Sequence, residues 1–182
     1  ELPDERKARF VQEYGLSGTD AEVLTSDRQL AEYFERVVRD YPQAKKVANW
    51  IMTEIMRELK GEEGVDIRTF PVPPENLASL LAMIDQGTIS GKIAKTVFEE
   101  MMASGKDPET VVKEKNLVQM SDEGELLAVV REIMAENPAQ VKQYKAGKTK
   151  VMGFFVGQLM KKTQGKANPQ LANQLFAKEL AK

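Results

Sequence analysis

Lysines surround one apolar helix close to the end of this sequence. The stretch from Gly147 to Gln170 reads GKTKVMGFFVGQLMKKTQGKANPQ, and its apolar centre is Val151–Met160. The lysines that flank this centre are Lys148, Lys150, Lys161, Lys162 and Lys166. Clustered ammonium groups attract polyanions, so the chemistry that this pattern favours is contact with phosphate groups.

The first two of these lysines stand where a helix disfavours positive charge. Lys148 and Lys150 precede the apolar helix, and the N-terminal end of a helix carries a partial positive charge of its own. A bound phosphate would explain them, whereas Lys161 and Lys162 suit the opposite end of the helix without any ligand. The two ends are about 15–18 Å apart at about 1.5 Å per residue, so they need not contact the same phosphates.

A second helix is expected to begin directly after the lysine cluster. Gly165 interrupts the chain, and Asn168-Pro169 is a helix start with asparagine as the N-cap and proline at the first helical position. Free N–H groups and the dipole at a helix start favour anions, and Lys166 lies beside them. The sequence therefore predicts an anion-binding end on a helical scaffold.

Two glycines interrupt the apolar helix. Gly153 and Gly157 each cost about 1 kcal/mol relative to alanine, which suggests that another backbone or a ligand approaches closely. The lysine-flanked run is too short for a membrane dimerisation helix, so tight packing in a soluble core is the favoured interpretation. A core face is likewise favoured over a base-stacking platform for Met152, Phe155, Val156, Leu159 and Met160.

Charge is distributed unevenly along the 182 residues. Residues 138–182 hold nine lysines and one acid (Glu179), a net charge of +8, whereas residues 1–137 hold 17 basic and 27 acidic residues, a net charge of −10. An acidic body with a basic end is typical of a spacer that carries a nucleic-acid contact. A lysine-rich solvated surface is the competing interpretation, and charge alone does not decide between them.

Signatures of catalysis are missing from the sequence. Cysteine and histidine are absent, which excludes disulfides, thiolate zinc sites, cysteine nucleophiles and the commonest general base. There is no Walker loop, dinucleotide fingerprint or nucleophile elbow. Neighbouring carboxylates such as Glu99 and Glu100 point about 100° apart on a helix and do not converge. We therefore expect no catalytic residue, no metal site and no cofactor in this chain.

Helical periodicity runs through nearly the whole chain and predicts an all-α multihelical array. No segment alternates long enough to form a sheet, and Gly61–Pro74 is expected to be an exposed, partly polyproline loop. Trp50 has the spacing of a core residue rather than of a base-stacking one. Helix starts are expected at Pro3, Ser26 (with Gln29 completing a capping box), Ser90, Asp107, Ser121, Asn137 and Asn168. The predicted division is a helical domain at 1–119 and a tail at 120–182.

These motifs identify a family resemblance that covers essentially the whole chain. The segment Gly153–Leu171, GFFVGQLMKKTQGKANPQL, resembles the C-terminal signature of the GatB family, the B subunits of tRNA-dependent glutamyl/aspartyl amidotransferases. Further matches, in the same order, are ELPDERKARF at the start, VLTSDRQLAEYFE at Val23–Glu35, Asn49-Trp50, GTISGKIAK at Gly87–Lys95, LVQMSDEGEL at Leu117–Leu126 and NPAQVKQYKAGK at Asn137–Lys148.

The resemblance implies a division of labour in a longer protein. The family's enzyme converts Glu-tRNA(Gln) to Gln-tRNA(Gln), often also Asp-tRNA(Asn) to Asn-tRNA(Asn), with ATP and an amide donor. Its N-terminal cradle holds the reaction site and magnesium, and nothing in this sequence matches that domain. What is present resembles the helical domain and the tail, which is shared in part with stand-alone YqeY-like proteins. The missing initiator Met also suggests a fragment.

The tail of the family contacts the outer corner of the tRNA. The resemblance therefore implies a non-catalytic, tRNA-binding, GatB/YqeY-like region that partners tRNA(Gln) or tRNA(Asn) and subunits A and C in the cytoplasm, away from membranes. The positions that it implies as tRNA contacts are Lys148, Lys150, Lys161, Lys162, Lys166 and Asn168, with Gly165 keeping the backbone accessible. Two other interpretations are a protein-interaction or spacer module and a stand-alone YqeY-like protein; the leader Glu1–Glu35 argues against the latter.

Overall fold

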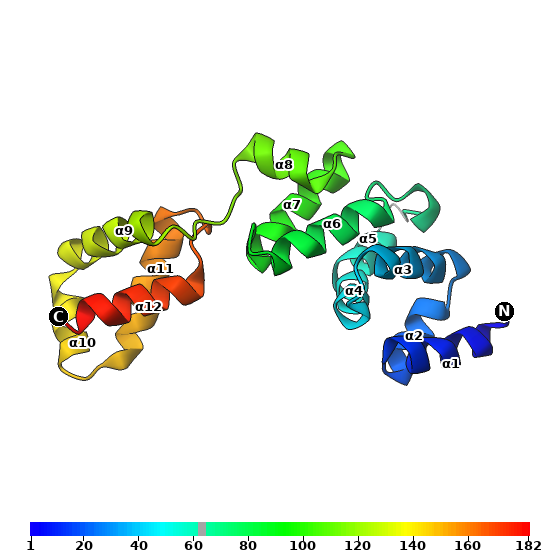
Figure 1. The fold of residues 1–182 in the computed structure, drawn as a ribbon, viewed down its shortest axis with the longest axis horizontal. Helices are drawn as coiled ribbons and strands as arrows, with labels where there is room; N and C mark the ends of the chain where they lie inside the picture. Colours follow the sequence, from blue (N-terminus) through cyan, green and yellow to red (C-terminus); the bar gives the residue numbers. More distant parts are fainter. Residues whose placement is uncertain (62–64) are drawn as a thin grey trace. The chain divides into compact units, whose positions relative to one another are not determined.

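The structure, a computed structural model, describes residues 1–61 and 65–182. These residues form twelve α-helices, with short 3-10 and π-helical turns, and their one β pairing is an isolated bridge between Met120 and Ala167 (Figure 1). The prediction of an all-α fold is confirmed. The predicted loop at 61–74 lies partly outside the described residues; its described part contains a 3-10 turn at Ile67–Thr69. No helix in these described ranges is long and apolar enough to cross a membrane.

Backbone contacts group the chain into two compact units. Unit 1 comprises Glu1–Asp85 and Val97–Glu114, and unit 2 comprises Gln86–Thr96 and Lys115–Lys182. The helix Gly91–Ser104 therefore starts in unit 2 and continues into unit 1. The division predicted between residues 119 and 120 stays a prediction, and it does not follow these units, because residues 86–96 group with the later part of the chain.

Unit 1 packs its helices around an aromatic core. Phe10 and Phe34 are fully buried with ring centroids 5.1 Å apart. Trp50 is half-buried and packs edge-to-face on the buried Phe98, at the margin of the core in which it was predicted to lie. The helices of this unit are α1 (Pro3–Tyr14), α2 (Gly18–Thr25), α3 (Arg28–Asp40), α4 (Ala44–Trp50), α5 (Met56–Leu59), α6 (Pro74–Asp85), α7 (Gly91–Ser104, in part) and α8 (Pro108–Lys115), with a π-helical turn at Ile51–Ile55.

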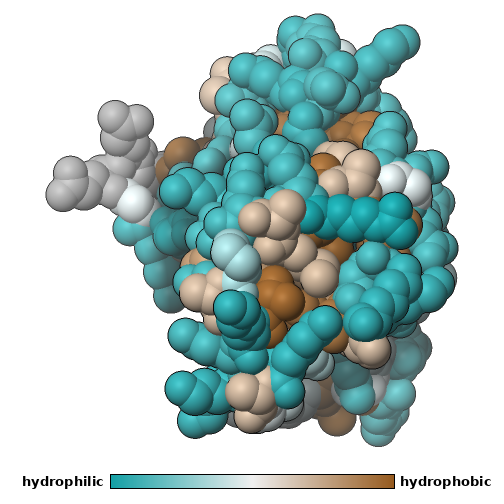
Figure 2. All heavy atoms as spheres, turned by 90° about the vertical axis from the view of Figure 1, so that its left-hand side faces the viewer, coloured by the Kyte–Doolittle hydropathy of each residue, from teal (hydrophilic) through white to brown (hydrophobic). Residues whose placement is uncertain are grey.

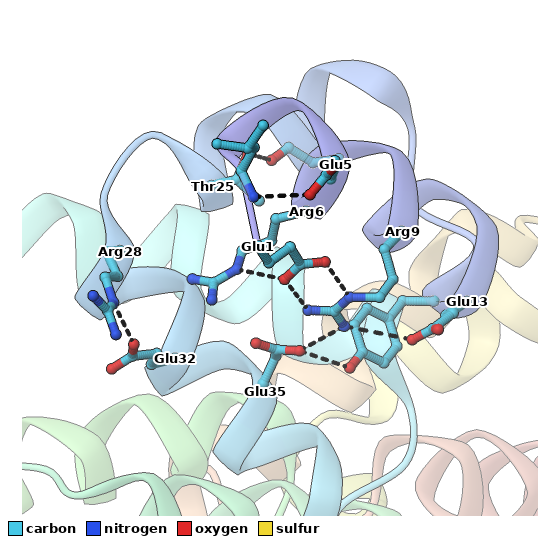
Figure 3. Close-up of polar contacts among 12 residues, drawn as sticks. Glu1, Glu5, Arg6, Arg9, Glu13, Thr25, Arg28, Glu32 and Glu35 are labelled. Carbon is cyan, nitrogen blue, oxygen red and sulfur yellow. Dashed lines mark hydrogen bonds and ion pairs between the residues drawn. The ribbon is translucent and has the colours of Figure 1, made fainter.

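An ion-pair network fixes α1 against α3 (Figure 3). The Arg9 guanidinium contacts both oxygens of Glu1, at 2.7 and 2.8 Å, and reaches Glu35 Oε1 on α3 at 2.7 Å. Arg6 donates a further bond to Glu1 at 3.0 Å. These hydrogen bonds, with Arg9 first, lower the pKa of Glu1 to about 2. The leader of the chain is thus held as part of unit 1.

Unit 2 is a small bundle with its own core. Its helices are α9 (Glu123–Glu136), α10 (Pro138–Lys145), α11 (Met152–Lys162) and α12 (Pro169–Leu180), and a 3-10 turn at Thr149–Val151 leads into α11. Phe155 of α11 stacks on Phe176 of α12 with ring centroids 5.3 Å apart. Both rings are fully buried, together with Leu126, Val130, Ile133, Leu159, Ala167 and Ala172.

Most predicted helix starts are confirmed, and two lie one residue away. Side-chain caps form at Ser90, Asp107 and Asn168 as expected, and α1 begins at Pro3.

Two predicted caps, Ser26 and Ser121, are wrong, and so is the capping box at Gln29. Asp27 caps α3 in place of Ser26, and Asp122 caps α9 in place of Ser121. A carboxylate accepts a stronger hydrogen bond than a hydroxyl. Ser26 instead closes the end of α2, where its hydroxyl donates to the Val23 carbonyl.

Asn137 also behaves differently from the prediction. It stands at the N-cap position of α10, but it makes no side-chain cap bond. Its side-chain amide donates instead to the Ile133 carbonyl at 2.8 Å, one turn back in α9. Pro138 still opens α10, because its fixed φ angle suits the first helical position and it has no N–H group to satisfy. The α9–α10 corner therefore depends on proline rather than on a cap.

Candidate nucleic-acid interface

The N-terminal end of α11 presents two exposed lysines. Lys148 precedes the 3-10 turn and Lys150 lies within it, and no side chain of the described residues caps either the turn or α11. Neither lysine forms an ion pair with a described residue, nor do Lys161 and Lys166 at the other end of the helix. These four charges are therefore not neutralised within the part of the chain that the structure describes.

The solvent side of α11 has an unusual composition. Lys150, Gly153, Phe154, Gly157 and Lys161 are all exposed and recur at the three- and four-residue spacing that places side chains on one helix face. We call these five residues the α11 face. Phe154 is 37% exposed, whereas its neighbour Phe155 is fully buried. An aromatic ring and two glycines thus lie between two lysines on an open helix surface.

Gly153 and Gly157 do not pack against any other described part of the chain. A Cβ atom placed on Gly153 or Gly157 would meet no atom within 4 Å outside its own helix backbone. The prediction that they allow tight packing in the core is wrong for both, because the opposite side of α11, with Phe155 and Leu159, is the side that faces the core. The predicted core role is confirmed for those two residues, and Met152, Val156 and Met160 pack partly buried against the same cluster.

The α11 turn, Thr163–Asn168, closes the helix with left-handed residues. Gln164 (φ 53°) and Gly165 (φ 78°) both adopt positive φ, and the Gly165 N–H donates to the Met160 carbonyl at 2.8 Å. This is the Schellman pattern, which satisfies carbonyls at a helix end. Gly165 is buried, because the side chain of Lys92 lies over it at 3.8–3.9 Å from a Cβ position. Its backbone is therefore not accessible, contrary to the prediction.

The N–H groups of Gln170 and Leu171 at the start of α12 are already hydrogen-bonded. Asn168 Oδ1 accepts from the N–H groups of Gln170 at 3.0 Å and Leu171 at 3.3 Å, and Pro169 has no N–H group. The prediction of an Asn-Pro helix start is confirmed, but the free N–H groups expected there are taken by the cap. The helix dipole still favours an anion beside Lys166. Asn168 acts in this structure as a cap.

Lys162 is engaged within unit 2. Its ammonium lies 2.9 Å from a carboxylate oxygen of Glu132 and 2.9 Å from one of Glu136, both on α9. The hydrogen bonds, Glu136 first, raise the pKa of Lys162 above its ordinary value. Its neighbour Lys161 has no such partner among the described residues. Of the two adjacent lysines, Lys161 is the one with a charge left for a ligand.

Sequence reasoning missed two residues of this region. Phe154 belongs to the apolar stretch Val151–Met160, but it directly precedes the buried Phe155 and so points about 100° away from it, towards solvent. Lys92 lies about 70 positions before the α11 turn. Lys92 shares the feature that singled out Lys148 and Lys150 in the sequence. Each is a cation near the N-terminal end of a helix, where the helix dipole disfavours positive charge. The position of Lys92 over Gly165 required the structure.

The face drawn in Figure 2 is mostly hydrophilic. Figure 2 faces the side on which α10 and the C-terminus lie in Figure 1, and hydrophilic residues cover most of it, with hydrophobic atoms visible between them near the centre.

Comparison with known proteins gives matches over the whole chain. A family described as GatB domain matches residues 32–180. The chain is 63% identical over all its 182 residues to the B subunit of an aspartyl/glutamyl-tRNA(Asn/Gln) amidotransferase from Desulfotalea psychrophila, of which it covers 38%. It is 55% identical to the corresponding protein of Carboxydothermus hydrogenoformans, again over 38% of that protein. It thus spans well under half the length of these relatives, in their C-terminal part.

Proposed function

The chain belongs to the GatB domain family, and from this premise we propose that it is the tRNA-binding, non-catalytic C-terminal region of an amidotransferase B subunit. The α11 face is the observation that carries the proposal. Its glycines cost helix stability, and no described residue fills the space beside them. A partner whose backbone packs closely on the helix would explain such a face. The lysines of the α11 face favour a polyanionic partner.

The geometry suits a folded RNA. RNA helices and their corners are recognised mainly through phosphates, 2′-hydroxyls and shape, with exposed bases stacked on aromatic rings. Lys148 and Lys150 would contact phosphates at one end of α11, and Lys161 and Lys166 at the other, about 15 Å away at about 1.5 Å per residue. Phe154, between them, is placed to stack on an unpaired base.

The proposed role in the reaction is supported by the name of the relatives. Their name specifies aspartyl- and glutamyl-tRNA as substrates. We propose that this chain positions Glu-tRNA(Gln) or Asp-tRNA(Asn), that ATP and Mg²⁺ act on a part of the protein outside these residues, and that subunits A and C complete the assembly. Its own contribution is binding energy and orientation, which are sufficient to bring a reacting end to a distant site.

The direct test is tRNA binding by the 182-residue chain at several salt concentrations. If about four lysines contact phosphates, a plot of log K against log salt should have a slope of about −3 to −4. Filter binding or fluorescence anisotropy with unmodified tRNA(Gln) measures this, with a single-stranded RNA of equal length as the competitor. Binding that is absent, or equally strong for the competitor, would overturn the proposal.

A second prediction concerns Gly153 and Gly157, where alanine should stabilise the helix and weaken tRNA binding. The double variant Gly153→Ala/Gly157→Ala should raise the free energy of unfolding by about 1–2 kcal/mol, because alanine is the better helix former and has space at both positions. The same methyl groups should hold RNA away from the helix and weaken tRNA binding about tenfold, or about 1.4 kcal/mol.

The matched control for the glycine variant is Gly18→Ala. Gly18 also has open space around it, and it lies in unit 1, at the start of α2. This variant should leave tRNA binding unchanged. A double variant that is more stable and binds as tightly as the original chain would show that the RNA does not approach the α11 face.

A further inference from the structure

Lys92, from the first turn of α7, lies against the α11 turn. Its Cδ, Cε and Nζ atoms are 3.8, 3.9 and 3.9 Å from the Cβ position of Gly165. Three successive atoms at nearly equal distance mean that the side chain extends across the glycine, with the ammonium beside the turn that also carries Lys166. Residues from two distant parts of the sequence thus place cations at one end of α11.

Backbone hydrogen bonds hold this arrangement together. The segment Leu117–Met120, which we call the strap, runs between the two parts. The Gln119 N–H donates to the Thr88 carbonyl at 2.7 Å, just before α7. The Met120 N–H donates to the Lys166 carbonyl at 2.6 Å, and the Met120 carbonyl accepts from Asn168 at 3.0 Å. The start of α7 is therefore tied through the strap to the α11 turn, and all three segments belong to unit 2.

The position of Lys92 is unfavourable for a purely structural cation. It is the second residue of α7, whose N-terminal end is capped by Ser90 and carries a partial positive charge. The side chain is exposed and forms no ion pair with a described residue. Covering Gly165 requires only the methylene groups, which a neutral side chain of the same length would supply. Among the described residues, no ion-pair partner accounts for the ammonium itself.

We propose that Lys92 is part of the RNA-binding surface of unit 2 and contacts a phosphate beside Lys166. The inference rests on the proposed function and adds to it a contact from outside the tail sequence. The cationic surface is then built from two sequence segments, the α7 start and residues 148–166. A phosphate that sits at the α11 turn is held by ammonium groups from both.

The test compares three variants of the 182-residue chain for tRNA binding across salt concentrations. Lys92→Met keeps the aliphatic cover over Gly165 and removes the charge, and we expect it to weaken binding about 5- to 8-fold at 0.1 M salt and to reduce the slope by about 0.7–0.9. Lys92→Arg should restore both. Lys113→Met removes one charge from an exposed site on α8 in unit 1 and should change neither.

The outcomes separate the inference from the proposed function. If the original chain binds tRNA with the expected slope and Lys92→Met binds like it, the inference is overturned and the proposed function stands. If Lys92→Arg is as weak as Lys92→Met and both melt at lower temperature, Lys92 has a structural role only, which also overturns the inference. If the original chain does not bind tRNA, the proposed function falls and takes the inference with it.

Discussion

A chain that carries Lys148→Gln, Lys150→Gln and Lys166→Gln is expected to bind tRNA about 100-fold more weakly at 0.1 M salt than the original chain. Each lysine–phosphate contact contributes about 0.7–0.9 to the slope of log K against log salt, so three contacts account for about two decades at this concentration. The slope itself should fall to about −1 to −2. None of these side chains forms an ion pair with a described residue, so folding should be little affected.

A charge-matched variant controls for long-range electrostatics. Lys45→Gln, Lys60→Gln and Lys113→Gln together also remove three positive charges, from exposed positions in unit 1. This variant should keep the original slope and lose affinity less than about threefold, because none of the three lysines belongs to the proposed RNA-binding surface and exposed charges that do not contact the RNA are largely screened at 0.1 M salt. Equal losses in the two variants would mean that net charge, rather than the ends of α11, governs binding.

The second large effect is expected on stability. Phe155→Ala should lower the free energy of unfolding of unit 2 by about 3–5 kcal/mol, because it removes a fully buried ring that stacks on Phe176 and leaves a cavity in the core. Urea unfolding followed by far-UV circular dichroism measures the loss. Trp50, the one tryptophan of the chain and a residue of unit 1, allows fluorescence to follow the other unit in parallel.

The adjacent phenylalanine provides the control. Phe154→Ala alters the exposed side of the same helix turn and should change the free energy of unfolding by less than about 1 kcal/mol. It should instead weaken tRNA binding by about 1–3 kcal/mol, the usual effect of removing an aromatic ring on which a base stacks. If Phe154→Ala destabilised the chain as much as Phe155→Ala, the assignment of the two faces of α11 would be incorrect.

Local signals in the sequence were sufficient for most of the fold. Asn168-Pro169 and Asp107-Pro108 predicted helix starts correctly, because capping and proline geometry act within a few residues. Ser26 and Ser121 were each one residue off, since a neighbouring aspartate competed for the same position. Helix boundaries depend on which of two adjacent groups makes the better hydrogen bond, and composition does not reveal this.

The candidate site was predictable only where one helix defines it. Lys148, Lys150 and Lys161 follow from the pattern around α11, and so does the core face of that helix with Phe155 and Leu159. Two features depended on other segments. Gly165 was expected to be open, and Lys92 covers it. Lys162 was expected to contact RNA, and whether it does is untested, although Glu132 and Glu136 hold its ammonium. Contacts between distant segments of the sequence decided each of these cases.

The position of residues 86–96 bears on how this protein can be dissected. A polypeptide that began at residue 120 would contain α9–α12 and the α11 face, but it would lack the Thr88 carbonyl that holds the strap and the side chain that covers Gly165. Unit 2 is therefore formed by two separate segments of the sequence. Grafting or truncating it intact requires the beginning of α7, and a domain swap between relatives would have to carry both segments together.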